Sequence, residues 1–234
     1  MASYAMPGMP LGRWRGAGLE NRQHEVKLSS LEIDLIDKRP VRVKIVGHSF
    51  ICHILKGLRK LYGIFHNFGI EEDVVEVSYL AQGGMHIDDV EADEIADGDP
   101  DIVYIELGTC DLDVPGVNGN AVGRQLYQLA QAVENYGVKR VIVGEVIFRQ
   151  EKGIPGEATD YNYQVMNMNR YLQSVMAPQN NEHFFFWRHK YLWGSKIQIY
   201  DDDGIHLNEL GDTRLYRSIR GAIFKMAREI KDEL

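Results

Sequence analysis

Some residues of this chain have the types and spacing that acyl transfer requires. Ser49 follows a glycine and a histidine, the pair Gly83-Gly84 forms a second glycine turn, and His206 stands three residues after Asp203. A serine hydroxyl becomes a nucleophile when an imidazole takes its proton, and a carboxylate orients that imidazole. Backbone N–H groups of a glycine turn can stabilise the oxyanion that forms during the reaction. These residues would therefore form a serine-hydrolase site if the fold brings them together.

The elements that must position these residues alternate between strand and helix. Strands are predicted at 41–46, 73–80, 101–107, 138–148 and 183–187, and helices at 50–62, 86–97, 119–136, 160–176 and 208–231. This alternation predicts an α/β fold, a three-layer α/β/α sandwich with a central five-stranded parallel sheet. In such folds, ligands bind beyond the carboxyl ends of the strands. The segments GHSF, QGGM and GTCD follow the first three strands, and DGIH follows the fifth, so we expect all four at one edge.

Length and composition narrow the class of protein. The chain has 234 residues, 44% of them hydrophobic, and a formal charge of −8, which disfavours nucleic acid as a partner. Two cysteines do not suggest a disulfide scaffold, and no apolar run is long enough to span a membrane. We expect residues 1–25 to be a flexible arm and residues 26–234 to be one domain. The oligomeric state does not follow from the sequence.

The two ends of the chain bear on where the protein acts. The first residues lack the apolar core of a signal peptide. The last four residues spell KDEL, which is an endoplasmic-reticulum retention signal only in proteins that enter the secretory pathway. We interpret KDEL as the coincidental end of an amphipathic helix, and the expected location is the cytoplasm.

The four segments GHSF, QGGM, GTCD and DGIH resemble, in this order, the sequence blocks of the SGNH hydrolases, also called GDSL esterases and lipases. The resemblance covers about residues 40–228. It implies that Ser49 is the nucleophile, that His206 is the general base and that Asp203 orients His206. It also implies that the backbone N–H groups of Ser49 and Gly84 face the oxyanion, with Gly83 beside them. The implied substrate is an acyl or acetyl ester of a small molecule, lipid or sugar, and no metal or organic cofactor is implied.

Two positions depart from the family pattern. His48 replaces the aspartate of Gly-Asp-Ser, and Cys110 replaces the asparagine whose side chain donates a hydrogen bond to the oxyanion. A thiol is a weak donor, and the loss of one oxyanion donor costs about 100- to 1000-fold in rate. The alternative function is therefore a catalytically weakened or inactive SGNH-fold domain that binds a partner or serves as a scaffold. Similar domains also occur inside mobile-element polyproteins, and this chain could be such a domain.

Each candidate residue also has a simpler interpretation. Ser49 can cap the following helix, and His206 can be a surface residue at the start of the last helix. The run 201–203 can be a solvated turn or a cation site, and the two adjacent glycines can serve only as a turn.

Cys110 and Arg149 each allow more than one role. Cys110 can be a small buried apolar residue, or it can be a nucleophile served by His206. Arg149, just after the fourth strand, can line the site or bind an acidic group, or it can be solvated on the surface. A flavodoxin-like nucleotide binder would share the sheet, but the first turn lacks a phosphate-binding loop.

Overall fold

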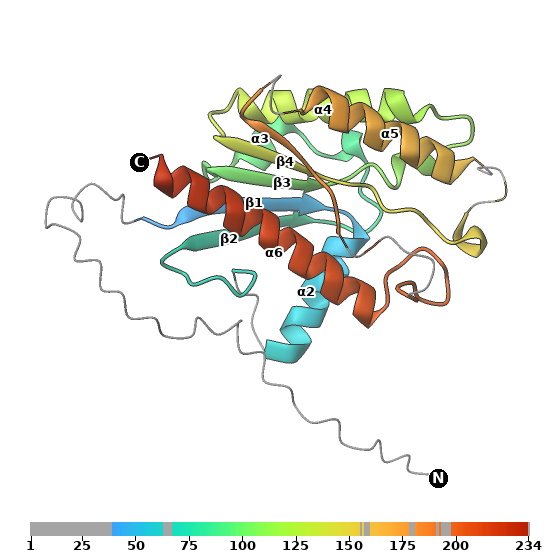
Figure 1. Ribbon diagram of the computed structural model, residues 1–234, viewed down its shortest axis with the longest axis horizontal. Helices are drawn as coiled ribbons and strands as arrows, with labels where there is room; N and C mark the ends of the chain where they lie inside the picture. Colours follow the sequence, from blue (N-terminus) through green and yellow to red (C-terminus); the bar gives the residue numbers. More distant parts are fainter. Residues whose placement is uncertain are drawn as a thin grey trace, which may run out of the picture. The chain divides into compact units, whose positions relative to one another are not determined.

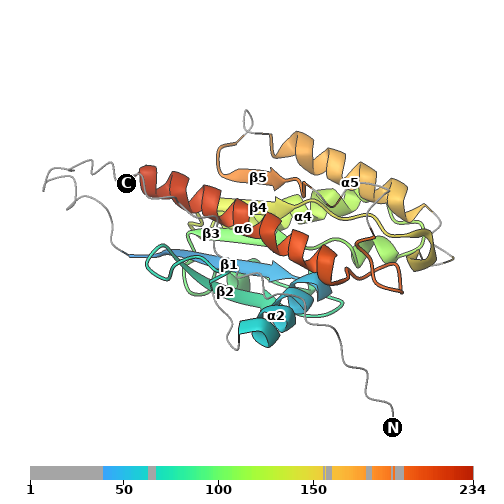
Figure 2. The same ribbon diagram turned by 60° about the horizontal axis from the view of Figure 1, so that its bottom comes forward.

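Five parallel strands form one sheet in a computed structural model that describes residues 39–62, 67–154, 156, 160–177, 181–190, 192 and 198–233. The strand order is β2-β1-β3-β4-β5, as Figure 2 shows. The strands are β1 (Val41–Gly47), β2 (Val75–Ala81), β3 (Ile102–Glu106), β4 (Arg140–Gly144) and β5 (Phe184–Trp187). The predicted five-stranded parallel sheet is therefore confirmed.

Helices connect consecutive strands, as parallel pairing requires. The α-helices are α2 (Ser49–Tyr62), α3 (Ala92–Ala96), α4 (Gly119–Glu134), α5 (Tyr161–Val175) and α6 (Glu209–Asp232), and short 3₁₀ turns are η1 (Ile87–Asp89), η2 (Asp111–Asp113) and η3 (Glu151–Gly153). Asparagine caps start two of the long helices. The side chains of Asn118 and Asn208 each accept two backbone hydrogen bonds, at α4 and α6 respectively.

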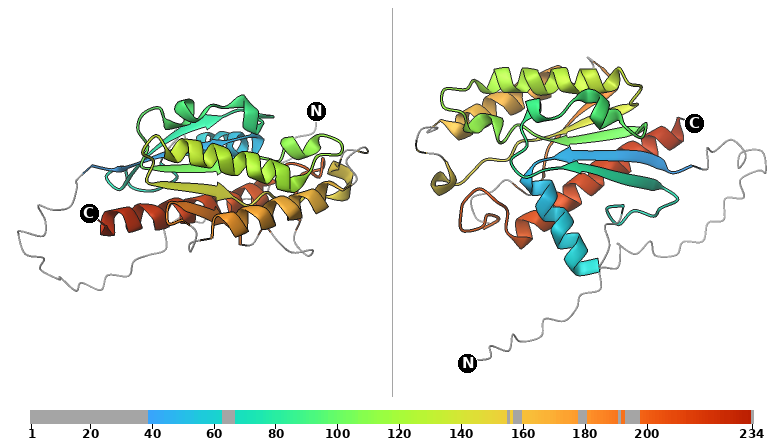
Figure 3. Two further views of the ribbon diagram at one scale, coloured as in Figure 1. Left: turned by 90° about the horizontal axis from the view of Figure 1, so that it is seen from above. Right: turned by 180° about the vertical axis from the view of Figure 1, so that it is seen from behind.

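The side chains of the sheet point alternately to two hydrophobic layers. Ile45 and Tyr104 pack with the apolar faces of α2 and α6, whereas Val103 and Ile105 pack with α3, α4 and α5. Figure 1 shows α6 in front of the sheet, and the view from behind in Figure 3 shows α3 on the opposite face. The three-layer α/β/α arrangement is confirmed.

The structure corrects three predicted boundaries. The second strand begins at Val75, because the residues before it form a turn, and the fourth strand ends at Gly144 rather than at 148. The predicted helix 86–97 is instead η1 followed by α3. Val90 separates them in an extended conformation with φ of −136° and is buried, so its packing interrupts the helix.

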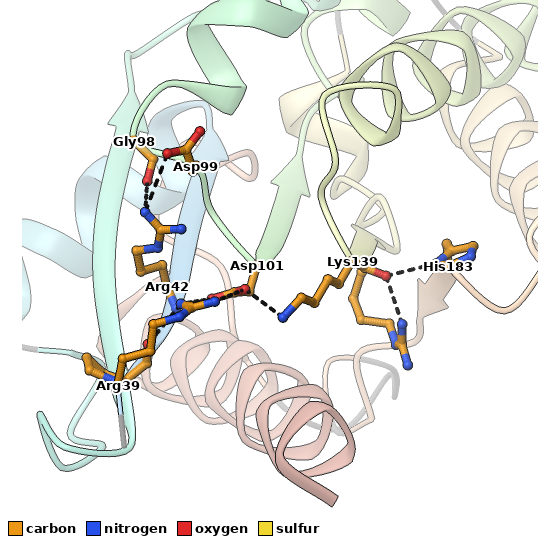
Figure 4. A network of polar contacts seen from close by, with 9 residues as sticks. Arg39, Arg42, Gly98, Asp99, Asp101, Lys139 and His183 are labelled. Atoms are coloured by element: carbon orange, nitrogen blue, oxygen red, sulfur yellow. Dashed lines mark hydrogen bonds and ion pairs between the residues drawn. The ribbon is translucent and has the colours of Figure 1, made fainter. Parts of the chain in front are cut away.

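An ion-pair cluster lies at the amino ends of the central strands (Figure 4). Asp101 precedes β3 and is 5% exposed. Its carboxylate accepts hydrogen bonds from the Arg39 guanidinium at 2.7 and 2.8 Å and from the backbone N–H of Arg42 at 3.0 Å, and it pairs with Lys139 at 3.1 Å. Burial alone would raise the pKa of Asp101, but these partners lower it well below its usual range.

Residues 37–234 form one compact unit, and every described element belongs to it. Residues 1–25, predicted to be a flexible arm, and the domain start expected at residue 26 lie outside the described residues. None of the helices that the structure describes is both long and apolar enough to cross a membrane.

Candidate active site

The segments after the first three strands lie next to one another at the carboxyl edge of the sheet. Gly47 at the end of β1 is in register with Ala81 of β2 and with Glu106 of β3. The backbone N–H of Gln82 donates to Gly47 O at 3.1 Å, and that of His48 donates to Glu106 O at 3.4 Å. The expected juxtaposition of the GHSF, QGGM and GTCD segments is therefore present.

Ser49 is the first residue of α2 and is half-buried at the turn after β1. Its Oγ lies 3.5 Å from Nδ1 of His48, which is itself 2% exposed. Burial lowers the pKa of His48 to about 4, and the charges of Arg149 and His206 add to this effect against the opposing charge of Glu106. His48 is therefore neutral at neutral pH and packs beneath the serine as an uncharged ring.

Asp203 and His206 form a hydrogen-bonded pair in the turn that precedes α6. Nδ1 of His206 lies 2.6 Å from Oδ2 of Asp203, and Oδ1 accepts the backbone N–H groups of Ile205 and His206, each at 2.8 Å. Burial of Asp203 would raise its pKa, but these hydrogen bonds outweigh it and lower the pKa to about 2. An ionised carboxylate only accepts hydrogen bonds, so in the neutral His206 ring Nδ1 carries the proton and Nε2 is the basic nitrogen.

The His206 ring rests on the helix that carries Ser49. It stacks on His53 with ring centroids 4.8 Å apart and an interplanar angle of 25°, and its edge meets Phe50 at 6.4 Å. This packing brings the Asp203–His206 pair to the first turns of α2. Among the described residues, no hydrogen bond joins Ser49 to His206. Such contacts often tighten only when substrate binds.

Gly83 and Gly84 are exposed just beyond β2. Gly84 has a φ of +75°, which favours glycine and turns its amide in a way other residues rarely allow. The Asp111 carboxylate holds this loop from the β3 side, because its Oδ1 accepts the N–H of Ile87 at 3.1 Å and lies 3.5 Å from His86 Nδ1. The GTCD segment thus holds the loop that begins with QGGM through the Asp111 carboxylate.

Cys110 follows β3 and is half-buried. Burial, together with the charges of Asp111 and Asp113, raises the pKa of its thiol to about 11. A neutral thiol is a poor nucleophile, which disfavours the interpretation of Cys110 as the attacking residue. The protonated thiol keeps an S–H group, which is a weak hydrogen-bond donor.

Arg149 lies inside the molecule, so the surface role considered for it is wrong. It is 7% exposed, and its guanidinium makes a two-pronged contact with Asp113 and lies 4.3 Å from the ring centre of Tyr161. Tyr161 in turn donates to Thr109 at 3.3 Å. The acidic group that Arg149 binds belongs to its own chain, and the contact holds the GTCD segment in place.

Three residues near the site were not predicted from the sequence: His53, Asp111 and Asp212. The i, i+4 spacing of Ser49 and His53 on one helix was the signal that could have revealed the first. Asp212 lies in the first turn of α6 with a buried Oδ1 that has no hydrogen-bond partner among the described residues. Burial and the charge of Asp201 raise its pKa to about 7, although His206 opposes this.

The described residues contain no group of three or more histidine, cysteine, aspartate or glutamate side chains arranged to hold a metal ion. A hollow of about 220 Å³ lies beyond β4 and β5, lined by residues that include Phe148, Arg170 and Arg188. None of the candidate site residues lines it.

No protein-family model matches the sequence, and no curated protein matches it at a significant level. Solved structures do match. A candidate acylhydrolase from Bacteroides fragilis is 16% identical with a TM-score of 0.62, covering 84% of this chain and 94% of its own. A carbohydrate esterase family 3 protein from Talaromyces cellulolyticus is 16% identical with a TM-score of 0.58, covering 81% and 99%. A GDSL-like lipase from Bacteroides thetaiotaomicron is 15% identical with a TM-score of 0.56, covering 80% and 89%. The chain has the SGNH hydrolase fold.

Proposed function

We propose that this chain is a serine esterase of the SGNH type that hydrolyses an acyl or acetyl ester through an acyl-serine intermediate. The observation that carries the proposal is the Asp203–His206 pair, held at 2.6 Å against the helix that begins with Ser49. A carboxylate that fixes Nδ1 leaves Nε2 as a base, and the GHSF turn at the start of the same helix supplies a serine hydroxyl as the nucleophile. The structural neighbours described as esterases and acylhydrolases support the same reaction class.

The proposed reaction has two halves. His206 takes the proton of Ser49 Oγ as Oγ attacks the ester carbonyl, and the tetrahedral oxyanion sits on the N–H groups of Ser49 and Gly84. His206 then gives the proton to the leaving alcohol, and the C–O bond of the ester breaks. Water, deprotonated by His206, attacks the acyl-serine, and His206 then returns the proton to Ser49 Oγ as the C–O bond to the acid breaks. Asp203 stabilises the imidazolium in both halves.

The openness of the site favours a short acyl group on a substrate whose remainder stays in solvent. Gly83 and Gly84 are exposed, and the side chains of Asp203 and His206 are 45% and 31% exposed. A long acyl chain would need an apolar cavity to cover it. The hollow beyond β4 and β5 is bordered by two arginines and by none of these residues. We therefore favour small-molecule or sugar acetyl esters over long-chain lipids.

Hydrolysis of p-nitrophenyl acetate by the wild type, Ser49→Ala and Cys110→Asn tests this function. We expect the wild type to turn over and Ser49→Ala to fall to the background rate. Cys110→Asn should raise the rate about 10-fold or more, because an amide donates a stronger hydrogen bond to the oxyanion than a thiol does. Equal rates for the wild type and Ser49→Ala, also with acetylated sugars and longer esters, would contradict the proposal.

Cys110 also favours a second candidate function, a binding or scaffold domain that keeps the fold with weakened catalysis. The raised pKa of its thiol leaves only a weak donor at this position. If Cys110→Asn becomes active while the wild type stays at background, the site is correctly built but weakened, and binding becomes the better account of the natural chain.

A further inference from the structure

His53 stands beside the proposed catalytic machinery and has no part in the reaction described above. It lies one helical turn after Ser49 on α2, so the two side chains leave the helix on the same face. Its half-buried ring stacks on His206 at 4.8 Å and 25°. Among the described residues, neither nitrogen of this ring has a hydrogen-bond partner, so ring stacking is its main specific contact there.

The general base needs a second support because its own turn is exposed. Asp201, Asp202 and Asp203 are all exposed, and within the described part of the chain the side-chain hydrogen bond of His206 goes to Asp203. One hydrogen bond to Nδ1 fixes the tautomer of the ring but leaves the ring free to tilt about that contact. A base displaced by about 1 Å can lose about 100-fold in rate.

We propose that His53 is a positioning residue, whose ring is the wall against which His206 stacks and which keeps Nε2 directed toward Ser49. This inference rests on the proposed role of His206 as the general base. Phe50 closes the edge of the same ring at 6.4 Å, so the two α2 side chains confine His206 on its face and at its edge. Helix α2 would thus carry both the nucleophile and the support of the base.

The charges around His53 suit this role. Burial lowers its pKa, and the nearby His206 and Lys56 lower it further, while Asp203 and Asp201 oppose them. His53 is therefore uncharged at neutral pH. His206 becomes an imidazolium during the reaction, and a cation is attracted to the face of a neutral aromatic ring. A charged His53 would instead repel it.

The test compares His53→Phe, which keeps an aromatic wall, with His53→Ala, which removes it. Lys60→Ala on the exposed side of α2 is the matched control. With p-nitrophenyl acetate, we expect His53→Ala to lower kcat about 10-fold with little change in KM, and His53→Phe and Lys60→Ala to stay within about threefold of the wild type. A wild-type kcat in His53→Ala, or an equal loss in His53→Phe, would overturn the proposal.

Histidine NMR separates this inference from the proposed function. We expect a nuclear Overhauser contact between the two rings, and a rise in the pKa of His53 in the variant His206→Ala, since the neighbouring charge is gone. If the wild type is active but neither effect appears, the stacking role is wrong and the esterase proposal stands. If both effects appear but the wild type hydrolyses no ester, the esterase proposal fails, and the positioning role falls with it.

Discussion

At the amino ends of the strands, the Asp101 carboxylate is hydrogen-bonded and ion-paired on both oxygens. At the carboxyl ends, several buried side chains each have one atom without a hydrogen-bond partner among the described residues. Asp101 has two cationic side chains and a backbone N–H around it (Figure 4). Three of the four buried side-chain atoms without a partner among the described residues belong to Asp111, Arg149 and Asp212, which lie near the candidate site. The fourth is Nε of Arg42, beside Asp101.

Asp101 at the amino edge and two aspartates at the carboxyl edge, Asp111 and Asp212, have pKa shifts in opposite directions. Hydrogen bonds and cations lower the pKa of Asp101, whereas burial raises the pKa of Asp111 and Asp212. Groups held in unfavourable charge states are typical of functional sites, while satisfied ion pairs mainly stabilise a fold. The comparison teaches that the ion pairs of the amino edge contribute to stability, whereas Asp111 and Asp212 at the carboxyl edge are buried at a cost in stability when they are ionised.

Asp203→Asn is the most stringent test of this difference between the two edges. The amide cannot stabilise the imidazolium of His206, so we expect kcat/KM for p-nitrophenyl acetate to fall about 1000-fold. The free energy of unfolding in urea should change little at pH 7, because Asp203 is exposed. A small rate loss, under about threefold, would contradict the role of the pair.

Asp101→Asn should have the opposite pair of effects, a loss of stability with an unchanged rate. It removes a charge that Arg39 and Lys139 share, so we expect the free energy of unfolding to fall by about 2 kcal/mol, less than for a fully buried pair because both cations are partly exposed. The rate should stay at the wild-type value per folded molecule. Urea unfolding and ester hydrolysis of the same sample check both statements, and a large specific rate loss would show that the two edges are not separate in function.

Gly84→Ala tests whether the backbone conformation of Gly84, rather than the mere presence of a glycine, matters at the carboxyl edge. A side chain is strained at a φ of +75°, so the loop would shift the Gly84 N–H, and we expect a rate loss of about 10-fold. Gly83 is the matched control, because a methyl group there meets nothing within 4 Å and its φ is not positive. Equal rates for Gly84→Ala and Gly83→Ala would remove Gly84 from the proposed oxyanion site.

The smallest expected effect is that of Asp212→Asn, and it depends on pH. The pKa of Asp212 is raised from an ordinary value of 3.8 to about 7, so the folded state holds a proton that the unfolded state releases. This group therefore lowers stability progressively as pH rises from about 4 to about 7. Asp212→Asn should match the wild type below pH 4 and be more stable by about 1 kcal/mol at pH 8. Urea unfolding across this range checks the sign, and a variant less stable at pH 8 would contradict it.

The sequence was sufficient to predict the sheet and the edge at which the candidate residues gather, because both depend on local patterns. Alternating strands and helices predict parallel pairing, and parallel strands necessarily present Gly47, Ala81 and Glu106 at one edge. The split of residues 86–97 was not predictable, since Val90 becomes extended only because it packs in the core. Tertiary packing overrode a helical pattern there.

Contacts between segments that lie far apart in the chain could not be predicted from the sequence either. Arg149 is buried because Asp113, 36 residues earlier, meets its guanidinium, and nothing next to Arg149 in the chain indicates this. The stacking of His53 on His206 likewise joins α2 to the turn before α6. Such contacts follow from how the elements pack and not from any local motif.

The most direct test of the central claim is to identify the residue that a fluorophosphonate ester labels. Such a probe reacts only with a serine activated by a base, so peptide mass spectrometry of the treated wild type should find one phosphonate adduct, on Ser49. His206→Ala should leave Ser49 unlabelled while the fold persists. No adduct on Ser49 in the folded wild type, or an adduct on another residue, would contradict the proposal that this chain is a serine esterase.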